Sequence, residues 1–387
     1  MKIVFTGGGT GGHFYPHIAI AEAIAKISGA ERKLEPKLYF MAPAPYDEQA
    51  LFENNITFVK SPAGKVRRYA ALSNVTDFFV TIFGVFWAFF KLLEIGPDVI
   101  FSKGGFGSVP TILAARVLSI PIVIHESDSM PGRANKLASK YAKRIAVTYP
   151  SSIAFFPKNT QSKIAVTGIP IRELLAQTLP EGAAQELGLD ASAPTILILG
   201  GSTGSKKINE AILTSLPDLV TFSNVIHQTG KNNFKEIESL SNIILEKSPQ
   251  ASRYHVFPYL TKDSMRQAAG VASLVISRAG STSITEISLW HKPAILIPIP
   301  ESISHDQKTN AYAYARTGAA VVLEEENMTP HILTSEAKRI VSDSALSARM
   351  GALGATFANP KSAEIIAREL ITIAASHTPR EKGVKYS

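Results

Sequence analysis

The first half of the chain alternates short apolar runs with longer stretches in which apolar residues recur at helical spacing. The short runs predict buried strands, because a strand covered on both faces shows no alternation of polar and apolar positions. We expect strands at residues 2–5, 37–41, 57–60, 99–102, 122–125 and 144–148, and helices at residues 17–27, 109–118 and 133–141. This alternation indicates a parallel sheet with helices on both faces, a Rossmann-like domain.

The same alternation begins again near residue 195. Strands are expected at residues 195–199, 224–227, 254–257, 274–277, 294–297 and 319–323, and a helix at residues 205–216. The predicted fold class is therefore α/β, with two Rossmann-like domains whose parallel sheets face a central cleft. Because such sheets bind ligands at the carboxyl ends of their strands, the two domains would share one ligand site.

The domain boundaries follow from the gaps in this pattern. Residues 1–172 form the first predicted domain, and residues 195–358 form the second. The stretch between them, residues 173–194, is interrupted by proline and glycine and is interpreted as a linker. The tail, residues 359–387, holds one more predicted helix at 361–375, which is a candidate for packing back onto the first domain.

The charge of the chain is unevenly distributed. The formal net charge is +8; residues 1–172 carry 20 Lys and Arg against 11 Asp and Glu, whereas residues 173–387 carry 20 against 21. A basic excess confined to one domain favours an anionic ligand or an anionic surface there. No DNA- or RNA-binding motif accompanies this excess, so we expect no nucleic-acid partner.

The composition also excludes several kinds of site. The chain has no cysteine, which excludes a thiolate nucleophile, a disulfide scaffold and a thiolate-bound metal. No acidic or histidine cluster shows metal-ligand spacing, so we expect neither a metal nor a cofactor. Residues 1–6 run directly into glycine, without the basic region, apolar stretch and cleavage site of a signal peptide, so we expect no signal peptide and a cytoplasmic protein.

A glycine-rich loop follows the first predicted strand of each domain, at residues 7–12 and 200–204. Such a loop exposes backbone N–H groups and the positive end of a helix dipole to an anion. The first loop matches G-x-G-x-x-G, but the second strand ends Met41-Ala42-Pro43, without the acidic residue of a dinucleotide site. Both loops favour another phosphate-bearing ligand; a tight turn without a ligand is the alternative.

Polar side chains cluster where predicted strands end. His13 follows the first loop, where its imidazole could act as a general base or merely cap the helix. Four polar residues at 125–128 end another strand of the same domain. In the second domain, the hydroxyls of residues 281–283 could hold phosphate. The carboxylate of Glu286 could hold ribose hydroxyls or simply complement the helix dipole.

Residues 78–90 form an uncharged aromatic segment. As a helix it would span roughly 20 Å, which is too short to cross a bilayer. Small or polar residues form a stripe down one face, namely Asp77, Thr81, Gly84, Ala88 and Lys91, and the basic residues Lys65, Arg67 and Arg68 precede the segment. An ordinary core helix is the alternative, but the basic excess of this domain favours insertion into the headgroup zone of an anionic leaflet. The expected membrane contacts are Phe79, Phe83, Phe86, Trp87 and Phe90.

Several short motifs follow one another along the chain. They are Gly8-Gly9-Thr10-Gly11-Gly12-His13 with Pro16, Ser102-Lys103-Gly104-Gly105-Phe106 with Pro110, His125-Glu126, Gly132 with Asn135-Lys136, Gly168-Ile169-Pro170-Ile171-Arg172, Leu199-Gly200-Gly201-Ser202 with Gly204, Arg278-Ala279-Gly280 with Glu286, and Asp306-Gln307 with Asn310-Ala311. The ordered set resembles the MurG family from the first residues to about residue 325. The resemblance implies a GT-B fold and an inverting transferase without an essential catalytic metal.

By this resemblance, the enzyme would move N-acetylglucosamine from UDP-N-acetylglucosamine to the muramyl 4-hydroxyl of lipid I, forming lipid II for peptidoglycan synthesis. It would be a peripheral protein at the cytoplasmic face of the inner membrane, with anionic lipid as a partner. His13, as the base, and Glu126 are the implied catalytic residues. The implied substrate-binding residues are Thr10, Gly11, Gly12, Asp128, Arg172, Ser202, Leu260, Ser281, Thr282, Ser283, Ile284, Thr285, Glu286 and Gln307.

The resemblance also implies which part of the substrates each of these residues contacts. Residues 10–12 would lie near a diphosphate, and Arg172, Ser202 and Leu260 would touch UDP. Residues 281–285 would cradle the UDP diphosphate, with Glu286 on the ribose and Gln307 on the sugar. The family usually has His-Glu-Gln-Asn at positions 125–128, so Asp128 exchanges an amide for a carboxylate. A glycolipid transferase with another acceptor, a nicotinamide-dependent oxidoreductase and a non-catalytic membrane or nucleic-acid binder are the alternatives.

Overall fold

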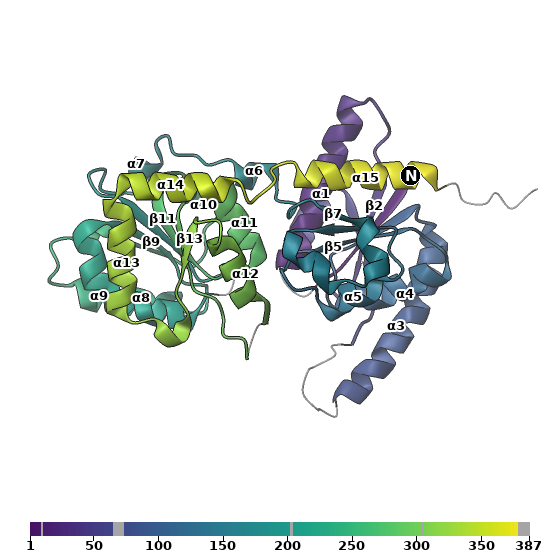
Figure 1. The fold of residues 1–387 in the computed structure, drawn as a ribbon, viewed down its shortest axis with the longest axis horizontal. Helices are drawn as coiled ribbons and strands as arrows, with labels where there is room; N and C mark the ends of the chain where they lie inside the picture. Colours follow the sequence, from purple (N-terminus) through teal and green to yellow (C-terminus); the bar gives the residue numbers. More distant parts are fainter. Residues whose placement is uncertain (9–10, 65–72, 202–203, 303–304, 378–387) are drawn as a thin grey trace, which may run out of the picture. The chain divides into compact units, whose positions relative to one another are not determined.

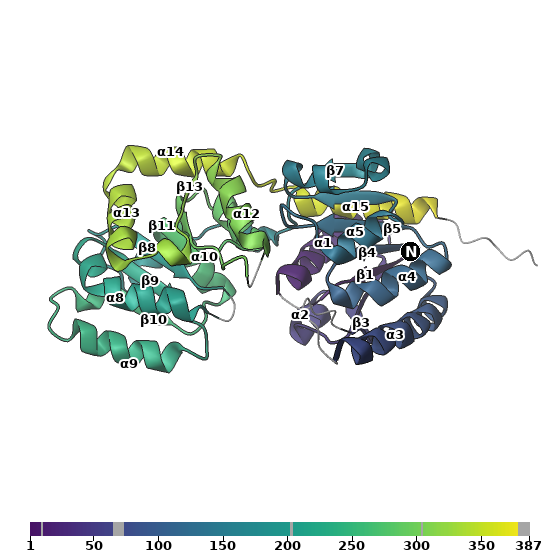
Figure 2. The same cartoon turned by 60° about the horizontal axis from the view of Figure 1, so that its bottom comes forward.

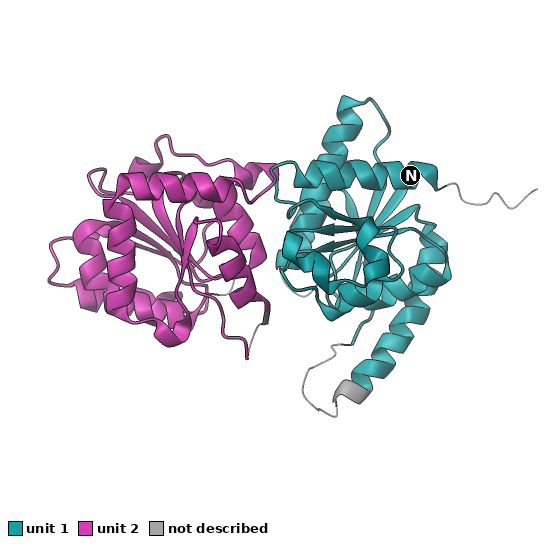
Figure 3. Ribbon diagram, in the orientation of Figure 1, with its two compact units in different colours: residues 1–172, 360–387 teal, residues 173–359 magenta. Residues whose placement is uncertain are grey.

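The computed structural model covers residues 1–387 and describes residues 1–8, 11–64, 73–201, 204–302 and 305–377. The chain divides into two compact units, which Figure 3 shows in different colours. The first unit comprises residues 1–172 and 360–387, and the second comprises residues 173–359. Each unit is built around its own parallel sheet.

The sheet of the first unit has seven parallel strands in the order β3-β2-β1-β4-β5-β6-β7. The strands are β1 (Lys2–Thr6), β2 (Lys37–Ala42), β3 (Ile56–Lys60), β4 (Val99–Ser102), β5 (Ile122–Glu126), β6 (Arg144–Val147) and β7 (Ile164–Val166). The helices are α1 (Gly11–Ala30), α2 (Glu48–Glu53), α3 (Ser73–Ile95), α4 (Val109–Val117), α5 (Arg133–Ser139) and α15 (Ser362–Ser376), with 3-10 turns η1 (Phe106–Ser108), η2 (Pro150–Phe155) and η3 (Lys158–Lys163).

Different helices cover the two faces of this sheet, as Figures 1 and 2 show. On one face, Phe5 of β1 packs with side chains of α1 and α15, including Ile366 and Leu370. On the other face, Val4 packs in a core that includes residues of α3, α4 and α5. Burial on both faces explains why the strands are almost continuously apolar. The tail therefore returns to the first unit, where α15 contacts α1.

The sheet of the second unit has six parallel strands in the order β10-β9-β8-β11-β12-β13. The strands are β8 (Thr195–Leu199), β9 (Asn224–Gln228), β10 (Tyr254–Phe257), β11 (Ala272–Ser277), β12 (Ala294–Leu296) and β13 (Ala320–Val322). The helices are α6 (Glu173–Ala176), α7 (Ala183–Glu186), α8 (Lys206–Phe222), α9 (Phe234–Leu245), α10 (Lys262–Val271), α11 (Ser281–Leu289), α12 (His305–Ala315), α13 (Pro330–Ser342) and α14 (Ser344–Ala355), with 3-10 turns η4 (Ala251–Arg253) and η5 (Glu325–Asn327).

Residues 173–194, interpreted above as a linker, belong to the second unit and contain α6 and α7. The indole Nε1 of Trp290 donates a 2.9 Å hydrogen bond to Leu175 O. A Cβ on Gly270 would lie 2.7 Å from the nitrogen of Pro180, so this segment packs directly on α10. The segment has short helices and no strand, and its contacts come from residues that are far away in the sequence.

Candidate active site

Three loops of the first unit meet at the carboxyl ends of the neighbouring strands β1, β4 and β5. A Cβ on Gly105 (φ +79°) would lie 2.8 Å from Gly8 O and 3.9 Å from His13 Cδ2. A Cβ on Gly104 would lie 2.8 Å from the amide of Asn135, beyond the third loop. Only glycine allows the loops to approach so closely, because any larger residue would push one loop off the next. The loops after β1 and β4 therefore form one packed surface around His13.

His13 lies in the first turn of α1, beside this surface. Burial lowers the pKa of its imidazole, the charge of Lys103 lowers that pKa further, and Asp128 acts in the opposite direction. The imidazole is thus neutral at pH 7, which is the form that a general base requires. Gly11 and Gly12 belong to the same turn, whereas Thr10 lies outside the described residues.

Glu126 ends β5 and is almost fully buried. Its Oε1 accepts a 3.0 Å bond from Asp128 N, and its Oε2 accepts bonds from Gly132 N (3.0 Å) and Asn135 Nδ2 (2.9 Å). Burial raises the pKa of Glu126 to about 7, although the three hydrogen bonds act against this shift. The carboxyl group of Glu126 thus holds the loop of residues 127–132.

Arg172 is also buried, and its guanidinium forms an ion pair with Glu22 of α1 at 2.5 Å. A second bond, from Arg172 Nε to Glu22 Oε1, is 2.7 Å long. Two guanidinium nitrogens, Nε and Nη2, thus share the single oxygen Glu22 Oε1, which restrains the guanidinium group. The structure therefore ties the expected UDP contact to the helix that begins with the first glycine loop.

In the second unit, the glycine loop after β8 packs on the end of β9. A Cβ on Gly204 (φ +79°) would lie 1.9 Å from Thr229 O, so this position requires glycine. Gly201 also has a positive φ, +89°, but a Cβ there would meet open space. Gln228 Oε1 accepts a 2.9 Å bond from Leu260 N, and its Nε2 lies 3.4 Å from Gly201 O. Gln228 thus connects this loop to Leu260, whose side chain lies in the core.

The N-terminus of α11 follows β11 and faces the same edge of the sheet. Ile284 N donates to Gly280 O at 3.0 Å, so the N–H groups of residues 281–283 precede the first helical hydrogen bond. Ile284 and Thr285 are buried one turn further along, and Thr285 Oγ1 donates to Ser281 O at 2.8 Å. The N–H groups of residues 281–283 therefore stand at the positive end of the helix dipole, within the segment 281–285 that the resemblance assigns to the diphosphate. Ser202 lies outside the described residues.

Arg278, just before α11, connects the ends of several strands. Its Nη2 donates to Ser205 Oγ, the N-cap of α8, at 2.6 Å, and it forms an ion pair with Glu325. Its Nη1 donates to Ile297 O at 3.1 Å. One guanidinium thus joins segments that follow β8, β12 and β13. The sequence pattern gives Arg278 no role beyond its place in a motif.

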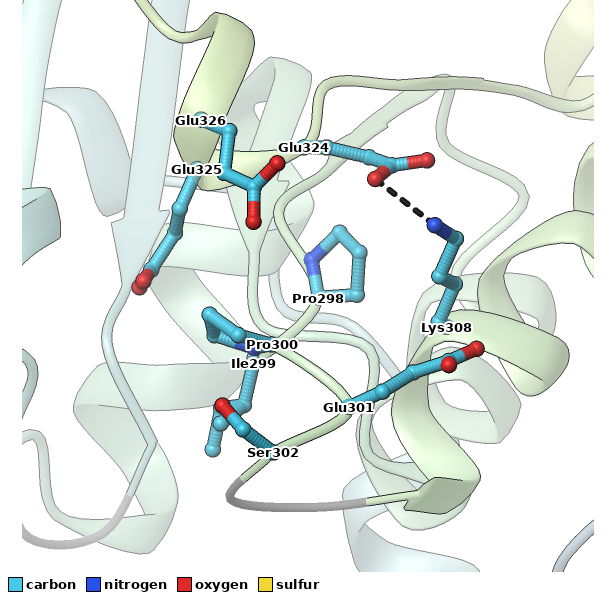
Figure 4. A pocket seen from close by; sticks show the side chains of 9 residues that line it. All are labelled: Pro298, Ile299, Pro300, Glu301, Ser302, Lys308, Glu324, Glu325 and Glu326. Carbon is cyan, nitrogen blue, oxygen red and sulfur yellow. Dashed lines mark hydrogen bonds and ion pairs between the residues drawn. The ribbon is translucent and has the colours of Figure 1, made fainter.

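A hollow of about 220 Å³ opens beside Arg278, after β12 and β13 (Figure 4). Its lining residues are Pro298, Ile299, Pro300, Glu301, Ser302, Lys308, Glu324, Glu325 and Glu326. Figure 4 shows the ion pair between Lys308 and Glu324, whose N···O distance is 2.9 Å. Gln307, the expected sugar contact, borders the hollow and accepts a 3.2 Å bond from Ile299 N. No group of three or more His, Asp or Glu in the described parts of the chain could hold a metal ion.

The aromatic segment lies within α3, which is longer than the sequence pattern suggested. The helix has 23 residues, and its residues 76–95 are long and apolar enough to cross a membrane by length and composition. Figure 1 shows α3 projecting from the sheet of its unit. Its outer side is exposed, with Phe79 at 64%, Phe86 at 63% and Phe90 at 65%. Phe83 and Trp87 are exposed as well, so these five residues do not form core.

The predicted stripe of small and polar residues faces the protein. A Cβ on Gly84 would lie 2.0 Å from Pro62 O, and Gly64 N donates to Thr81 Oγ1 at 3.2 Å. Ala88 is fully buried with α4 residues in the core of the unit. Trp87 Nε1 donates to Lys60 O at 2.9 Å. The helix is therefore held along one side. Lys65, Arg67 and Arg68 lie outside the described residues.

Both domains match one enzyme class. Residues 3–147 match the glycosyltransferase family 28 N-terminal domain, and residues 195–365 match the glycosyltransferase family 28 C-terminal domain. Acinetobacter baumannii MurG has a similar structure, with a TM-score of 0.73 and 26% identity over 96% of this chain and all of that one. A UDP-GlcNAc 2-epimerase from Neisseria meningitidis shares the fold at 14% identity and a TM-score of 0.67, over 96% of this chain and all of that one. The chain is a glycosyltransferase with two parallel α/β domains, as the sequence predicts.

Two curated relatives define the family more narrowly. One from Treponema denticola is 36% identical over 345 residues, 85% of each chain. Another from Clostridium kluyveri is 36% identical over 342 residues, 88% of this chain and 91% of that one. Both are named UDP-N-acetylglucosamine--N-acetylmuramyl-(pentapeptide) pyrophosphoryl-undecaprenol N-acetylglucosamine transferase. The chain belongs to the MurG family, which confirms the resemblance found in its motifs.

Proposed function

We propose that this protein transfers N-acetylglucosamine from UDP-N-acetylglucosamine to the muramyl 4-hydroxyl of lipid I, producing lipid II. The observation that carries the proposal is the 36% identity, over 85% of the chain, to the relative from Treponema denticola that is named as an N-acetylglucosamine transferase. The packed glycine loops of the first unit and the N-terminus of α11 in the second would supply the two anion sites that such substrates need. The family match lends no support to the nicotinamide-dependent alternative.

We assign the donor to the second unit. The UDP diphosphate binds at the first turn of α11 and at the loop after β8, where N–H groups and helix dipoles offset its charge. Gln228 and Arg278 both hold the segment after β8. Gln228 contacts Gly201 O in the glycine loop, and Arg278 contacts Ser205 at the start of α8. Glu286 binds the ribose hydroxyls, and Gln307 contacts the sugar. Leu260 completes the contacts to UDP within this unit.

We assign the acceptor to the first unit. Its diphosphate binds the loop that includes Thr10, Gly11 and Gly12, and the muramyl 4-hydroxyl lies at His13. The neutral imidazole takes the hydroxyl proton while the oxygen attacks the anomeric carbon, and the bond from that carbon to UDP breaks. This single displacement inverts the anomeric centre, and the leaving UDP carries the electron pair of the broken bond. Asp128 borders the site, and Glu126 holds the loop that carries Asp128.

The first unit also attaches the enzyme to the membrane. We place α3 in the headgroup zone of the cytoplasmic leaflet, with Phe79, Phe83, Phe86, Trp87 and Phe90 in contact with lipid. Its length would permit a crossing, but Gly84 and Ala88 are packed against the protein, which holds the helix as a peripheral element. The excess of Lys and Arg in residues 1–172 favours anionic lipid.

The function is tested by measuring UDP release from UDP-N-acetylglucosamine with a panel of lipid-linked acceptors. We expect rapid release with a lipid I analogue and little with the same carrier bearing a different sugar. Release with the other acceptor alone would identify a different glycolipid transferase. If the protein neither released UDP nor was protected by UDP against heat, the proposed function would be wrong.

The donor site also predicts a pH dependence. Burial raises the pKa of Glu286 to about 7 in the unliganded protein, so the carboxyl is largely protonated at pH 6. Ribose hydroxyls are donors, and the ionised carboxylate is the better acceptor for them. We therefore expect UDP-N-acetylglucosamine to bind more tightly as pH rises from 6 to 8, with release of a proton.

Calorimetry at several pH values checks this expectation. UDP-N-acetylglucosamine is the appropriate ligand, because its diphosphate diester does not titrate in this range. Glu286→Gln should weaken binding at pH 8 and abolish the trend. An equally steep trend in Glu286→Gln would assign the proton to another group.

A further inference from the structure

A buried histidine of β9, His227, is hydrogen-bonded on both sides of its ring. It is fully buried, as is its neighbour Asn209 of α8. His227 Nδ1 lies 2.9 Å from the hydroxyl of Tyr254, and its Nε2 lies 3.1 Å from Asn209 Oδ1. Asn209 Nδ2 donates a 3.1 Å bond to Thr229 O. These four residues, Tyr254, His227, Asn209 and Thr229, form a continuous row of hydrogen bonds, which we call the His227 network.

The backbone carbonyl at one end determines the direction of every bond in the His227 network. A carbonyl oxygen can only accept, so Asn209 turns its Nδ2 towards Thr229 and its Oδ1 towards His227. The amide oxygen also only accepts, which places a ring proton on Nε2. Burial lowers the pKa of His227 to about 3, so the ring is neutral and Nδ1 accepts from the hydroxyl of Tyr254. Both ring nitrogens and both amide atoms are thus engaged.

The glycine loop after β8 packs on the same carbonyl that ends the His227 network. Thr229 follows the end of β9, and its carbonyl accepts from two side-chain amides, since Asn233 Nδ2 also donates to it at 3.0 Å. A Cβ on Gly204 would lie 1.9 Å from Thr229 O and 2.9 Å from Asn233 Nδ2. Gly204 N in turn donates to Gly201 O at 3.1 Å. The positions of Gly201 and Gly204 therefore depend on where Thr229 O is held.

We propose that His227 is a positioning residue of the donor site. Its Nε2–H orients the amide of Asn209, this amide holds Thr229 O, and the carbonyl sets the place of the glycine loop that receives the UDP diphosphate. The ring is buried, so it acts through Asn209 rather than on a substrate. None of the four residues of the His227 network is among those that the family resemblance assigns to the substrates. The inference rests on the proposed binding of the donor to the second unit.

Two substitutions of His227 separate its hydrogen bond from the space that its ring fills. His227→Gln keeps an N–H donor near the place of Nε2, whereas His227→Met has a side chain of similar length without a donor. We expect His227→Met to raise KM for UDP-N-acetylglucosamine about tenfold and to change kcat less than about threefold, because the glycine loop binds the donor before the reaction. His227→Gln should restore most of the affinity. Steady-state rates of UDP release with a lipid I analogue give both constants.

Calorimetry with UDP measures the donor site without an acceptor, and the same loss of about tenfold is expected for His227→Met. The matched control is Ile340→Val, which shortens a fully buried side chain of α13 in the same unit. It should lower Tm and leave the affinity for UDP unchanged. The proposal is overturned if Ile340→Val loses as much affinity as His227→Met, if His227→Met binds UDP like the wild type, or if His227→Gln is as defective as His227→Met.

The tautomer of His227 is a readout that needs no substrate. In protein labelled with ¹⁵N at histidine, NMR should show a proton on Nε2 and none on Nδ1 from about pH 5 to pH 8, with His227→Gln identifying the signals. A proton on Nδ1 would contradict the His227 network.

Further outcomes separate this test from that of the function. If His227→Met does not fold, Asn209→Ala removes the amide that reaches Thr229 O, and the same loss of UDP affinity is expected of it. If the wild type binds UDP but releases none with lipid I analogues, the proposed reaction fails, and the UDP affinities of the variants still decide the role of His227. If the wild type binds no UDP, both the donor assignment and the positioning role are wrong.

Discussion

Replacing His13 with Ala is expected to lower kcat for UDP release by about 10²–10⁴-fold, the usual contribution of a general base. The neutral imidazole lies beside the packed glycine loops, and its removal takes away the proposed acceptor of the hydroxyl proton. UDP-N-acetylglucosamine should still protect the variant against heat, because its proposed site belongs to the second unit. Steady-state measurements with a lipid I analogue give the rate.

The matched control is His331→Ala, which replaces an exposed histidine of α13. It should retain the wild-type rate. Because the pKa of His13 is lowered, the wild-type kcat at saturating UDP-N-acetylglucosamine should also persist below pH 6.5, the ordinary value for histidine, before it falls. A His13→Ala rate within a few-fold of wild type would exclude this residue as the base.

Replacing Phe86 and Phe90 together with Ser is expected to weaken binding to vesicles that contain phosphatidylglycerol by roughly 100-fold. Both side chains are exposed on α3, at 63% and 65%, so their loss does not remove core packing. At about 1.5 kcal/mol each, the lower end for a buried apolar side chain, the two account for that factor. Sedimentation with the vesicles measures the change.

Phe52→Ser is the control for this effect, because Phe52 is 80% exposed on α2 of the same unit. It should bind vesicles like the wild type. Trp87 is left intact, since its indole donates to Lys60 O and its loss would also disturb the fold. Equal sedimentation of Phe86→Ser/Phe90→Ser and wild type, with both folded, would show that α3 is not the anchor.

The sequence predicted the elements whose pattern is strong. Each expected strand is present. Strands that are covered on both faces of a sheet are almost continuously apolar, and this pattern can be recognised from the sequence. The strand β7 was not predicted, since its three residues carry too little pattern. The sequence predicted a stripe of small or polar residues along one face of the aromatic segment. In α3, two residues of this stripe, Gly84 and Ala88, face the protein.

The candidate site was predictable to a lesser extent. His13 and Glu286 could be selected because each stands near a glycine loop or a helix start, where local chemistry suggests a role. Lys103 and Arg278 could not be assigned roles in this way. Lys103 follows β4, whereas its partners His125 and Ser127 lie at the end of β5. Arg278 follows β11, whereas its partners Ser205 and Glu325 follow β8 and β13. Neither pairing follows from spacing along the chain.

The sequence by itself determined that the chain forms two parallel α/β domains, with a glycine loop after the first strand of each. It did so because periodicity and glycine placement are local properties of the backbone. Only the tertiary structure decided that α15 packs in the first unit, that Glu126 holds a loop, and that a buried Lys103 contacts His125 and Ser127. These outcomes depend on which strands are neighbours, and burial and charge at a strand end are set by residues from several strands at once.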